Sequence, residues 1–374
     1  MRKGSTSPAP ASLPDNDDLL LDIFLRLPPL PSSLPRASLV CKRWRCLLSD
    51  PAFLRRFRAH HLCSPMLGYF VVDFGNWLVP VFSPTLPAPD RIPPARFSFP
   101  QRPDEGLWFL GCRHGLALLF NREKLEVVVW DPITGRRCCI SLPPELQMNH
   151  LHPNIKADMY NGALLRDRHT SAFKVVMILS NQLYHRVWAC LYESDSGKWG
   201  NIVSTAVPSS TSVPCPSVLV RNALCWIIHR SGGGVLEFDT DKQSLAVIQM
   251  PEEIHDGGDT SDSSARVLRT QEGGLGLAIL SGEKLMLWKE TAISDPVARW
   301  VFEKTIELDK LISLGSSMEA HHPTDIVGFD EDTNVIFVWK AIGVFMIQLE
   351  SMKPTHVSSE SCVSGIRSLP DLPR

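Results

Sequence analysis

The spacing of hydrophobic residues near the N-terminus predicts three short helices within residues 13–61. The apolar side chains of the first helix fall on one face, at Leu19, Leu20, Ile23, Phe24 and Leu27. Pro28-Pro29 ends this helix, because proline lacks the amide hydrogen that a helix interior needs. The second helix carries an apolar stripe at Leu34, Ala37, Cys41, Trp44 and Leu48. The third begins at Asp50-Pro51, an N-cap residue followed by proline in the first turn.

From about residue 63 the helical spacing stops, and short β-prone runs alternate with turn sequences. The turn sequences include Asp131–Gly135 and Asp195–Gly197, in which Asp, Pro and Gly favour tight turns. This part of the chain is therefore predicted to be all-β. The clearest predicted strands are Leu116–Phe120, Glu126–Trp130, Lys174–Leu179, Val187–Tyr192, Ala223–Ile228, Val235–Asp239, Leu275–Leu280, Lys284–Trp288, Val335–Trp339 and Val344–Gln348.

A weak internal repeat relates several of these strands. Gly115–Phe120 leads to Trp130-Asp131, and Ala223–Ile228 leads to Phe238-Asp239 at the same offset. Successive units lie roughly 40–60 residues apart, a period typical of β-propeller blades. The β part is therefore predicted to be propeller-like, with about six or seven blades. A large β-sandwich is the alternative, although that architecture does not require repeated strand–turn–strand units.

The composition is that of a globular protein with no strong preference for charged partners. Of 374 residues, 44% are hydrophobic and 21% are charged, and the formal net charge is −2. We therefore expect no attraction to nucleic acid or to an anionic membrane surface. The N-terminus has no apolar stretch of the signal-peptide type, and no run of about 18 apolar residues follows it. We expect an intracellular protein, in the nucleus, the cytoplasm or both.

Ten cysteines are present, but their context predicts neither disulfides nor a metal site. Inside the cell thiols stay reduced, and Cys190 and Cys225 lie in apolar runs where a thiol acts as a small buried hydrophobe. The chain has no C-x-x-C pair, and its histidines do not show the spacing typical of zinc ligands. Nucleotide-binding and hydrolase motifs are also missing, so we expect no metal, no cofactor and no catalytic residue.

Four strings follow one another in a distinctive order within residues 13–57. The most specific part is a V-C-K-x-W-R string, Val40–Arg45, ahead of a D-P-x-F string, Asp50–Phe53. Leu13-Pro14 and the amphipathic stretch Leu19–Pro28 precede them. In this order the strings resemble the F-box family, in particular plant F-box proteins that carry a C-terminal F-box-associated β-propeller-like domain.

The resemblance implies a domain organisation and a function. Residues 1–12 would be a disordered leader, residues 13–61 the F-box helical domain, and residues 63–374 the β-propeller-like, substrate-binding domain. An F-box docks on a Skp-family adaptor and through it on a cullin scaffold, while the β domain holds a target protein for ubiquitination and degradation. Such a subunit is not an enzyme: it raises the effective concentration of the target near the ubiquitin-charged enzyme.

The resemblance also indicates which side chains contact the adaptor. Helices this short bury little surface by themselves, so we expect the block to need a partner. Trp44 is the strongest candidate for a dominant contact, because buried tryptophans anchor many interfaces. The alternative is that Trp44 and Ile23 simply fill the three-helix core. The full expected set is Leu13, Pro14, Leu20, Ile23, Leu27, Val40, Cys41 and Trp44.

Two other functions stay open at this point. A β-propeller enzyme, hydrolase or oxidoreductase-like, could use acidic pairs such as Glu193 with Asp195 as acid and base. These residues, like Asp330–Asp332, fall in predicted turns, where Asp stabilises the backbone by local hydrogen bonds. The third possibility is an interaction scaffold that binds a partner without promoting its degradation.

Overall fold

The protein is described here by a computed structural model. The described residues are 16–61, 65–73, 76–99, 106–147, 158–166, 172–181, 184–207, 213, 216–228, 233–251, 264–291, 300–312, 324–340, 342–358 and 365–370. They belong to two compact units, one containing the N-terminal helices and residues 87–90, the other containing the β-sheets. The boundary predicted between residues 61 and 63 falls within residues 62–64, which lie outside the described part of the chain.

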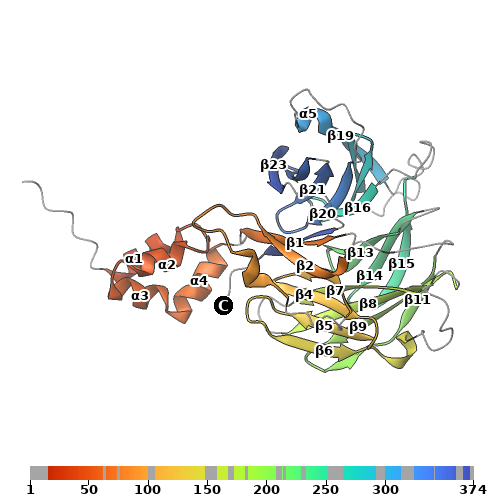
Figure 1. Cartoon of the computed structure of the whole chain (residues 1–374), viewed down its shortest axis with the longest axis horizontal. Coiled ribbons are helices and arrows are strands. Elements are labelled where there is room, and N and C mark those ends of the chain that lie inside the picture. Colours follow the sequence, from red (N-terminus) through yellow and green to blue (C-terminus); the bar gives the residue numbers. More distant parts are fainter. Residues whose placement is uncertain are drawn as a thin grey trace, which may run out of the picture. The chain divides into compact units, whose positions relative to one another are not determined.

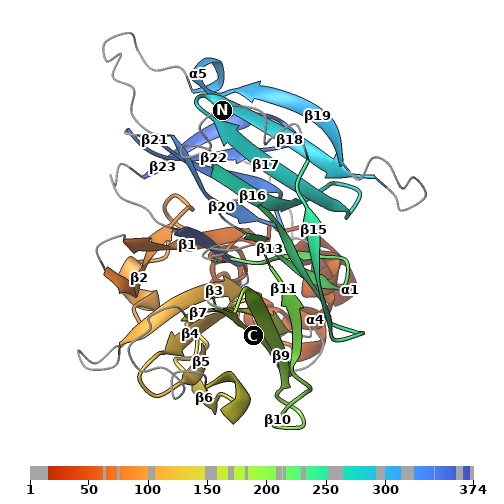
Figure 2. The same ribbon diagram turned by 90° about the vertical axis from the view of Figure 1, so that its right-hand side faces the viewer.

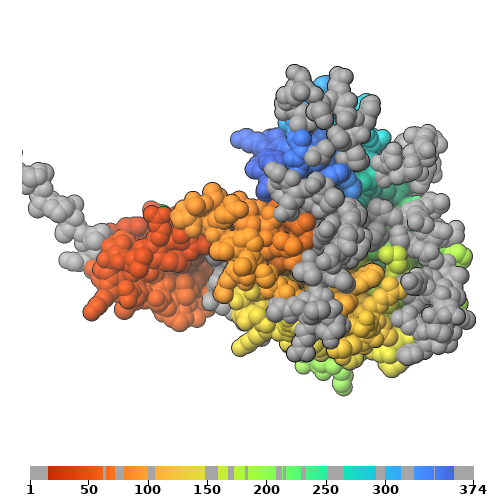
Figure 3. Space-filling model, viewed as in Figure 1, coloured from red at the N-terminus to blue at the C-terminus, as the bar shows by residue number. Residues whose placement is uncertain are grey.

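The first unit contains four helices, labelled in Figure 1, where the sequence pattern predicts three. Figure 3 draws the residues of these helices in space-filling form, in red and orange-red. The second predicted helix is interrupted at Cys41, whose backbone is extended, with φ −159° and ψ 169°. The Sγ atom of Cys41 accepts a hydrogen bond from the Trp44 amide at 3.4 Å and so caps a new helix. The prediction of a single helix carrying the stripe from Leu34 to Leu48 is therefore wrong. The helices are α1 (Asp17–Leu25), α2 (Ser33–Ser38), α3 (Lys42–Leu48) and α4 (Pro51–His60).

Side-chain caps explain where two other helices begin. The amide oxygen of Asn16 accepts a hydrogen bond from the Asp18 amide at 2.9 Å, and thereby starts α1. The carboxylate of Asp50 accepts from the Phe53 amide at 3.1 Å, and Pro51 occupies the first turn of α4. The predicted start of this last helix is confirmed.

Residues 87–90 belong to the helical unit, and one hydrogen bond connects them to α2. The Ser32 amide, at the start of α2, donates a hydrogen bond of 2.7 Å to the carboxylate of Asp90. This contact supplies one of the acceptors that the first turn of a helix lacks. No helix among the described residues is long and apolar enough to cross a membrane.

In the second unit, the described strands form six antiparallel sheets. Four sheets have four strands, one has five, and one has three. Figure 2 shows β16 to β19 side by side as one of the four-stranded sheets. The strands are β1 (Met66–Asp73), β2 (Asn76–Pro84), β3 (Leu107–Arg113), β4 (Leu116–Asn121), β5 (Glu126–Trp130), β6 (Arg137–Ser141), β7 (Asp158–Arg166), β8 (Phe173–Asn181), β9 (Arg186–Glu193), β10 (Lys198–Trp199), β11 (Val203–Ala206), β12 (Val218–Val220), β13 (Ala223–Ile228), β14 (Gly234–Asp239), β15 (Ser244–Gln249), β16 (Ser264–Arg269), β17 (Leu275–Ser281), β18 (Lys284–Glu290), β19 (Trp300–Glu307), β20 (Asp325–Asp330), β21 (Val335–Lys340), β22 (Gly343–Gln348), β23 (Lys353–Ser358) and β24 (Gly365–Pro370). Three short helical segments accompany them: η1 (Pro94–Phe97), η2 (Pro144–Leu146) and α5 (Leu308–Leu311).

The sheets follow one another as the blades of a β-propeller. The first strands of successive sheets contact each other: β3 contacts β7, β12 contacts β16, and β16 contacts β20. The side-chain Nδ2 of Asn161 in β7 donates a 2.6 Å hydrogen bond to the carbonyl of Val213, which precedes β12 by five residues. The last sheet closes the ring, because β24 from the C-terminal end pairs with β1 from the other end of the unit. The inner strand of that sheet, β24, contacts both β20 and β3.

The predicted fold class, a small helical domain followed by a propeller-like all-β domain, is confirmed. Five sheets have four or five strands, and the three-stranded sheet completes the ring, compared with the prediction of about six or seven blades. The core lies between neighbouring sheets: one cluster joins Leu118 and Val127 of the β3–β6 sheet to Val175 and Leu179 of the next sheet.

Candidate functional site

The helical unit closes its own core. The fully buried side chains include Leu20, Phe24 and Phe53, each 1% exposed, and Leu48 and Phe57 complete the cluster. Phe24 makes edge-to-face contacts with the Phe53 ring at 6.3 Å and with the Trp44 ring at 4.8 Å between centroids. Aromatic pairs in this geometry are favourable beyond the area they bury.

Outside this core, the helical unit leaves large apolar side chains in solvent. Leu19 and Ile23 lie one turn apart on α1 and are 49% and 45% exposed. Leu39 and Val40, between α2 and α3, are 75% and 57% exposed. We call these four residues the helical apolar patch. Single exposed apolar residues are common on protein surfaces, but groups of them indicate an interaction site.

An ion pair holds the two halves of the helical apolar patch on neighbouring elements. The Arg43 guanidinium, in the first turn of α3, donates to the Asp17 carboxylate, in the first turn of α1, at 2.8 Å. Val40 and Cys41 directly precede α3, and Leu19 lies in the first turn of α1. Both charged groups are largely exposed, so the pair itself contributes little stability.

The eight residues predicted to contact an adaptor fall into four groups. Ile23, Val40 and Cys41 are exposed. Leu27 and Trp44 are partly buried and pack on the helical core. Leu20 is fully buried in that core, because it points inward with Phe24, and so offers no surface to a partner. Leu13 and Pro14 lie outside the described residues. Leu19 and Leu39, both exposed, were not among the residues predicted to contact the adaptor.

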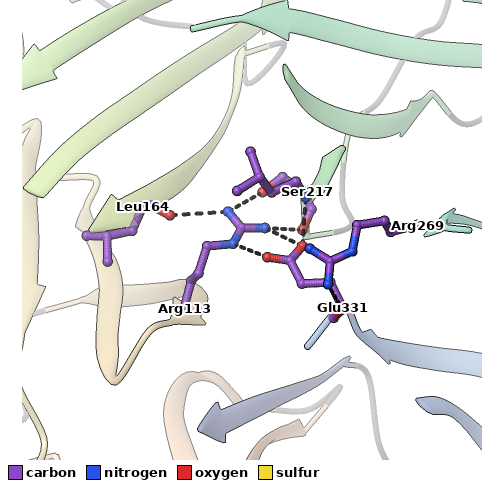
Figure 4. Close-up of polar contacts among 6 residues, drawn as sticks. Arg113, Leu164, Ser217, Arg269 and Glu331 are labelled. Carbon is purple, nitrogen blue, oxygen red and sulfur yellow. Dashed lines mark hydrogen bonds and ion pairs between the residues drawn. The ribbon is translucent and has the colours of Figure 1, made fainter. Parts of the chain in front are cut away.

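In the β unit, charged side chains meet near the axis of the propeller. Figure 4 shows the guanidinium of Arg113, at the end of β3, facing the carboxylate of Glu331, directly after β20. The two make a bidentate ion pair: Nε donates to Oε1 at 2.7 Å and Nη2 donates to Oε2 at 3.1 Å. Each side chain is only 10% exposed. We call this pair and its partners the axial cluster.

The remaining hydrogen bonds of the axial cluster come from other sheets. Arg113 Nη1 donates to the Leu164 carbonyl of β7 at 3.2 Å, and Nη2 donates to the Ser217 carbonyl before β12 at 2.9 Å (Figure 4). The Leu219 amide of β12 donates to Glu331 Oε2 at 2.6 Å. Arg269, at the end of β16, donates to the backbone carbonyl of Glu331. Five blades are thereby joined through one ion pair.

The axial cluster differs from what the enzyme hypothesis requires. That hypothesis predicts several Asp, Glu or His side chains converging on the axis, or a metal. Among the described residues, the axial cluster as defined above contains one carboxylate, Glu331, which is bound by Arg113 and by the Leu219 amide. In the described part of the chain, no group of three His, Cys, Asp or Glu side chains is placed to hold a metal ion. Asp330, from the same acidic run, accepts a hydrogen bond from the Thr333 amide within its turn.

The buried thiols are unsuited to nucleophilic chemistry. Burial raises the pKa of the Cys190 thiol from 9.0 to about 11. The pKa of Cys225 is raised even further, by burial and then by the neighbouring carboxylates of Glu237, Glu290 and Glu331. Because the thiolate is the reactive form of cysteine, both groups are inert at neutral pH. They act as small apolar core residues, as predicted from the sequence.

Comparisons with known proteins agree with both units. Residues 11–60 match the family model "F-box-like", and residues 108–366 match "F-box protein AT5G49610-like, beta-propeller". Putative F-box protein At3g22650 of Arabidopsis thaliana is 23% identical over 86% of this chain and 82% of its own length. F-box/LRR-repeat/kelch-repeat protein At2g27520 of the same plant is 22% identical over 94% and 93%. A solved structure, described as "Structure of Dos1 propeller", is 12% identical, with a TM-score of 0.37 over 80% of this chain and 71% of that chain.

Proposed function

This chain belongs to the F-box proteins with an AT5G49610-like β-propeller, and from that premise we propose that it is the substrate-recognition subunit of an SCF-type ubiquitin ligase. F-box domains generally bind Skp-family adaptors within SCF complexes. In this proposal the helical unit docks on such an adaptor, and through it on a cullin scaffold. The β unit binds a target protein and holds it for ubiquitination and degradation. The complex works inside the cell, in the nucleus, the cytoplasm or both.

The helical apolar patch is the observation that supports the docking step. The helices already have a closed core, built on Leu20, Phe24 and Phe53. Leu39 and Val40 lie outside this core and expose their side chains, whereas apolar side chains of this size are normally buried. Burying a valine or leucine side chain contributes about 1.5–3 kcal/mol, so an adaptor that covers the patch gains much of its binding free energy there.

The contribution of the β unit is geometric in this proposal. A bound target has its lysines held near the ubiquitin-charged enzyme, which converts a bimolecular encounter into an effectively intramolecular one. No side chain of this protein needs to take part in bond formation, and the single carboxylate of the axial cluster is occupied by Arg113. The proposal therefore treats the protein as an adaptor rather than as an enzyme.

Val40→Asp tests the docking step directly. Val40 is 57% exposed, so the substitution leaves the helical core intact while placing a charge in the proposed interface. We expect the full-length variant to bind a recombinant Skp-family adaptor at least about tenfold more weakly than the wild type in titration calorimetry. Val301→Asp is the matched control, because Val301 is 39% exposed on β19 of the other unit. Equal adaptor affinity for Val40→Asp and Val301→Asp contradicts the proposal.

The degradation step needs a separate experiment, because a scaffold would also bind a target. Proximity labelling in cells with the wild type and with Val40→Asp separates adaptor from target: the target remains labelled in both. The proposal expects the half-life of that target to lengthen in cells that express Val40→Asp. An unchanged half-life, with the target still bound, identifies the protein as a non-degradative scaffold.

A further inference from the structure

Four arginines occupy the same position in four successive blades. Arg113 ends β3, Arg166 ends β7, Arg221 directly follows β12, and Arg269 ends β16. Each stands where the innermost strand of a sheet leads to the second strand, so all four lie at the same end of the propeller axis. In the fifth blade, Glu331 follows β20 at the corresponding position.

Short distances connect these arginines into one group. Arg113 is bound to Glu331, and Arg269 donates to the backbone carbonyl of Glu331 (Figure 4). Arg166 Nη1 donates at 3.4 Å to the carbonyl of His114, the neighbour of Arg113. Arg221 Nη2 would be 3.7 Å from a Cβ atom added at Gly274, in the turn that follows Arg269. We call this group the arginine ring.

The charge of the arginine ring is only partly balanced. The Glu331 carboxylate neutralises Arg113, whereas the hydrogen bonds of Arg166 and Arg269 go to backbone carbonyls, which carry no net charge. Within the described part of the chain, no carboxylate forms an ion pair with Arg166, Arg221 or Arg269. Two further acids lie in the same turns: Asp332, which has a partner, and Glu272, which is exposed.

We propose that the arginine ring is the target-binding site of the β unit, and that it binds an acidic peptide segment of the target protein. One arginine–carboxylate contact of the proposed kind is already present within the protein. Arg113 holds the Glu331 carboxylate in the bidentate geometry by which arginine recognises carboxylates. The other three guanidinium groups come from three different blades and lie against different residues: Arg166 donates to His114, Arg269 donates to Glu331, and Arg221 lies near Gly274. Carboxylates spaced along a peptide match such a distribution better than a single phosphate group does. The inference rests on the proposed function, since it names the class of target that the ligase receives.

Fluorescence anisotropy with defined peptides tests the site. The probe is a short fluorescein-labelled peptide in which Glu alternates with Gly, added to the full-length protein at low ionic strength, where charge–charge contacts are least screened. We expect it to bind, and the matching Lys–Gly peptide not to bind. In Arg166→Ala/Arg221→Ala the affinity should fall at least about tenfold, because a hydrogen bond to a charged group is worth about one to two decades in binding. Arg221→Glu, a change at an exposed position, should abolish binding without disturbing the fold.

Arg136→Ala is the matched control, because Arg136 is exposed in the β5–β6 turn and is not part of the arginine ring. The inference is overturned if the wild type does not bind the Glu–Gly peptide, or if Arg136→Ala weakens binding as much as the double variant does. It is also overturned if a peptide with a single phosphoserine binds and the Glu–Gly peptide does not. Adaptor binding separates the two proposals: the double variant should keep it, and Val40→Asp should lose it while still binding the peptide. If the wild type binds the adaptor but not the peptide, only the arginine-ring proposal is refuted. If it binds the peptide but not the adaptor, only the docking proposal is refuted.

Discussion

The ion pair of the axial cluster allows a stability prediction with an internal control. Glu331→Gln removes the negative charge and leaves the Arg113 guanidinium, which is 10% exposed, without a counter-ion. Removing one partner of a buried ion pair costs about 3–5 kcal/mol. Glutamine keeps an oxygen that accepts from the Leu219 amide, so we expect the lower end of this range, about 3 kcal/mol.

The control is an ion pair with almost the same distance but a different exposure. Lys174 Nζ lies 2.8 Å from the Glu193 carboxylate, and their side chains are 48% and 43% exposed. Water solvates both charges in this pair, so Glu193→Gln, the same chemical change, should cost less than about 1 kcal/mol. Because the two ion pairs have almost the same distance, a difference in the loss of unfolding free energy between the two variants reports the effect of burial.

Urea unfolding of the full-length protein, followed by tryptophan fluorescence, measures both variants. Trp130 and Trp226 are 2% and 0% exposed within the sheets, so their emission reports unfolding of the β unit. In a double-mutant cycle, Arg113→Met with Glu331→Gln should lose less stability than the sum of the two single changes. Equal losses for Glu331→Gln and Glu193→Gln would refute the reasoning, because they would show that the buried pair is no more important than an exposed one.

Three further predictions concern glycine and cysteine residues. Gly162→Ala should destabilise the protein by about 1–3 kcal/mol in the same unfolding assay, because its new Cβ would lie 2.8 Å from Met177 Sδ, whereas Gly135→Ala, with open space but φ +75°, should cost about 1 kcal/mol. Alkylation by iodoacetamide, read by mass spectrometry, should label exposed Cys41 and spare Cys190 in the folded protein. Because the folded state raises the pKa of Cys190 from 9.0 to about 11, its contribution to stability is complete below pH 9.0 and is lost as the pH rises towards 11, so the free energy of unfolding should fall less steeply with pH in Cys190→Ala.

The strands that the sequence predicted correctly share one environment. All ten are second or third strands of the five larger sheets, and β4 and β13 show why: their residues are almost all buried on both faces. Such strands appear as continuous apolar runs. The outer strands, such as β6 and β15, each bury only one residue. Runs of this kind are hard to distinguish from turns, and they were not predicted.

The helical unit illustrates a different limit. The stripe from Leu34 to Leu48 keeps helical spacing across a break in the helix, because α2 and α3 pack on the same core. Periodicity alone therefore could not show that Cys41 leaves the helix. The sequence also did not show which side chains are exposed. Leu19 and Leu20 are adjacent and both apolar, yet Leu19 is 49% exposed and Leu20 is 1% exposed. The register of a short helix decides between them, and that register depends on the Asn16 cap.

The arginine ring was missed for a reason that lies in the repeat itself. The repeat was aligned from Gly115 and Ala223 onward, and Arg113 and Arg221 stand two residues before these positions. Extending the alignment to include them would have shown an arginine at the same place in two blades. Arg166 and Arg269 would have been harder to find, since the turns that follow them differ in length.

An arginine at the end of an inner strand can donate hydrogen bonds to backbone carbonyls that have no partner in a sheet. Its positive charge can still attract an acidic partner. The inner strand of each blade has a sheet neighbour on one side only, so its other edge presents backbone groups that must find partners elsewhere. Arg113 provides them for the Leu164 and Ser217 carbonyls, and Arg269 does so for the Glu331 carbonyl. A backbone carbonyl satisfies the hydrogen bond of a guanidinium but not its charge, whereas a carboxylate satisfies both. Arg113 has its counter-ion in Glu331, whereas the charges of Arg166 and Arg269, which donate to backbone carbonyls, are not balanced by their hydrogen bonds. An acidic segment of a target is the kind of ligand that would balance them.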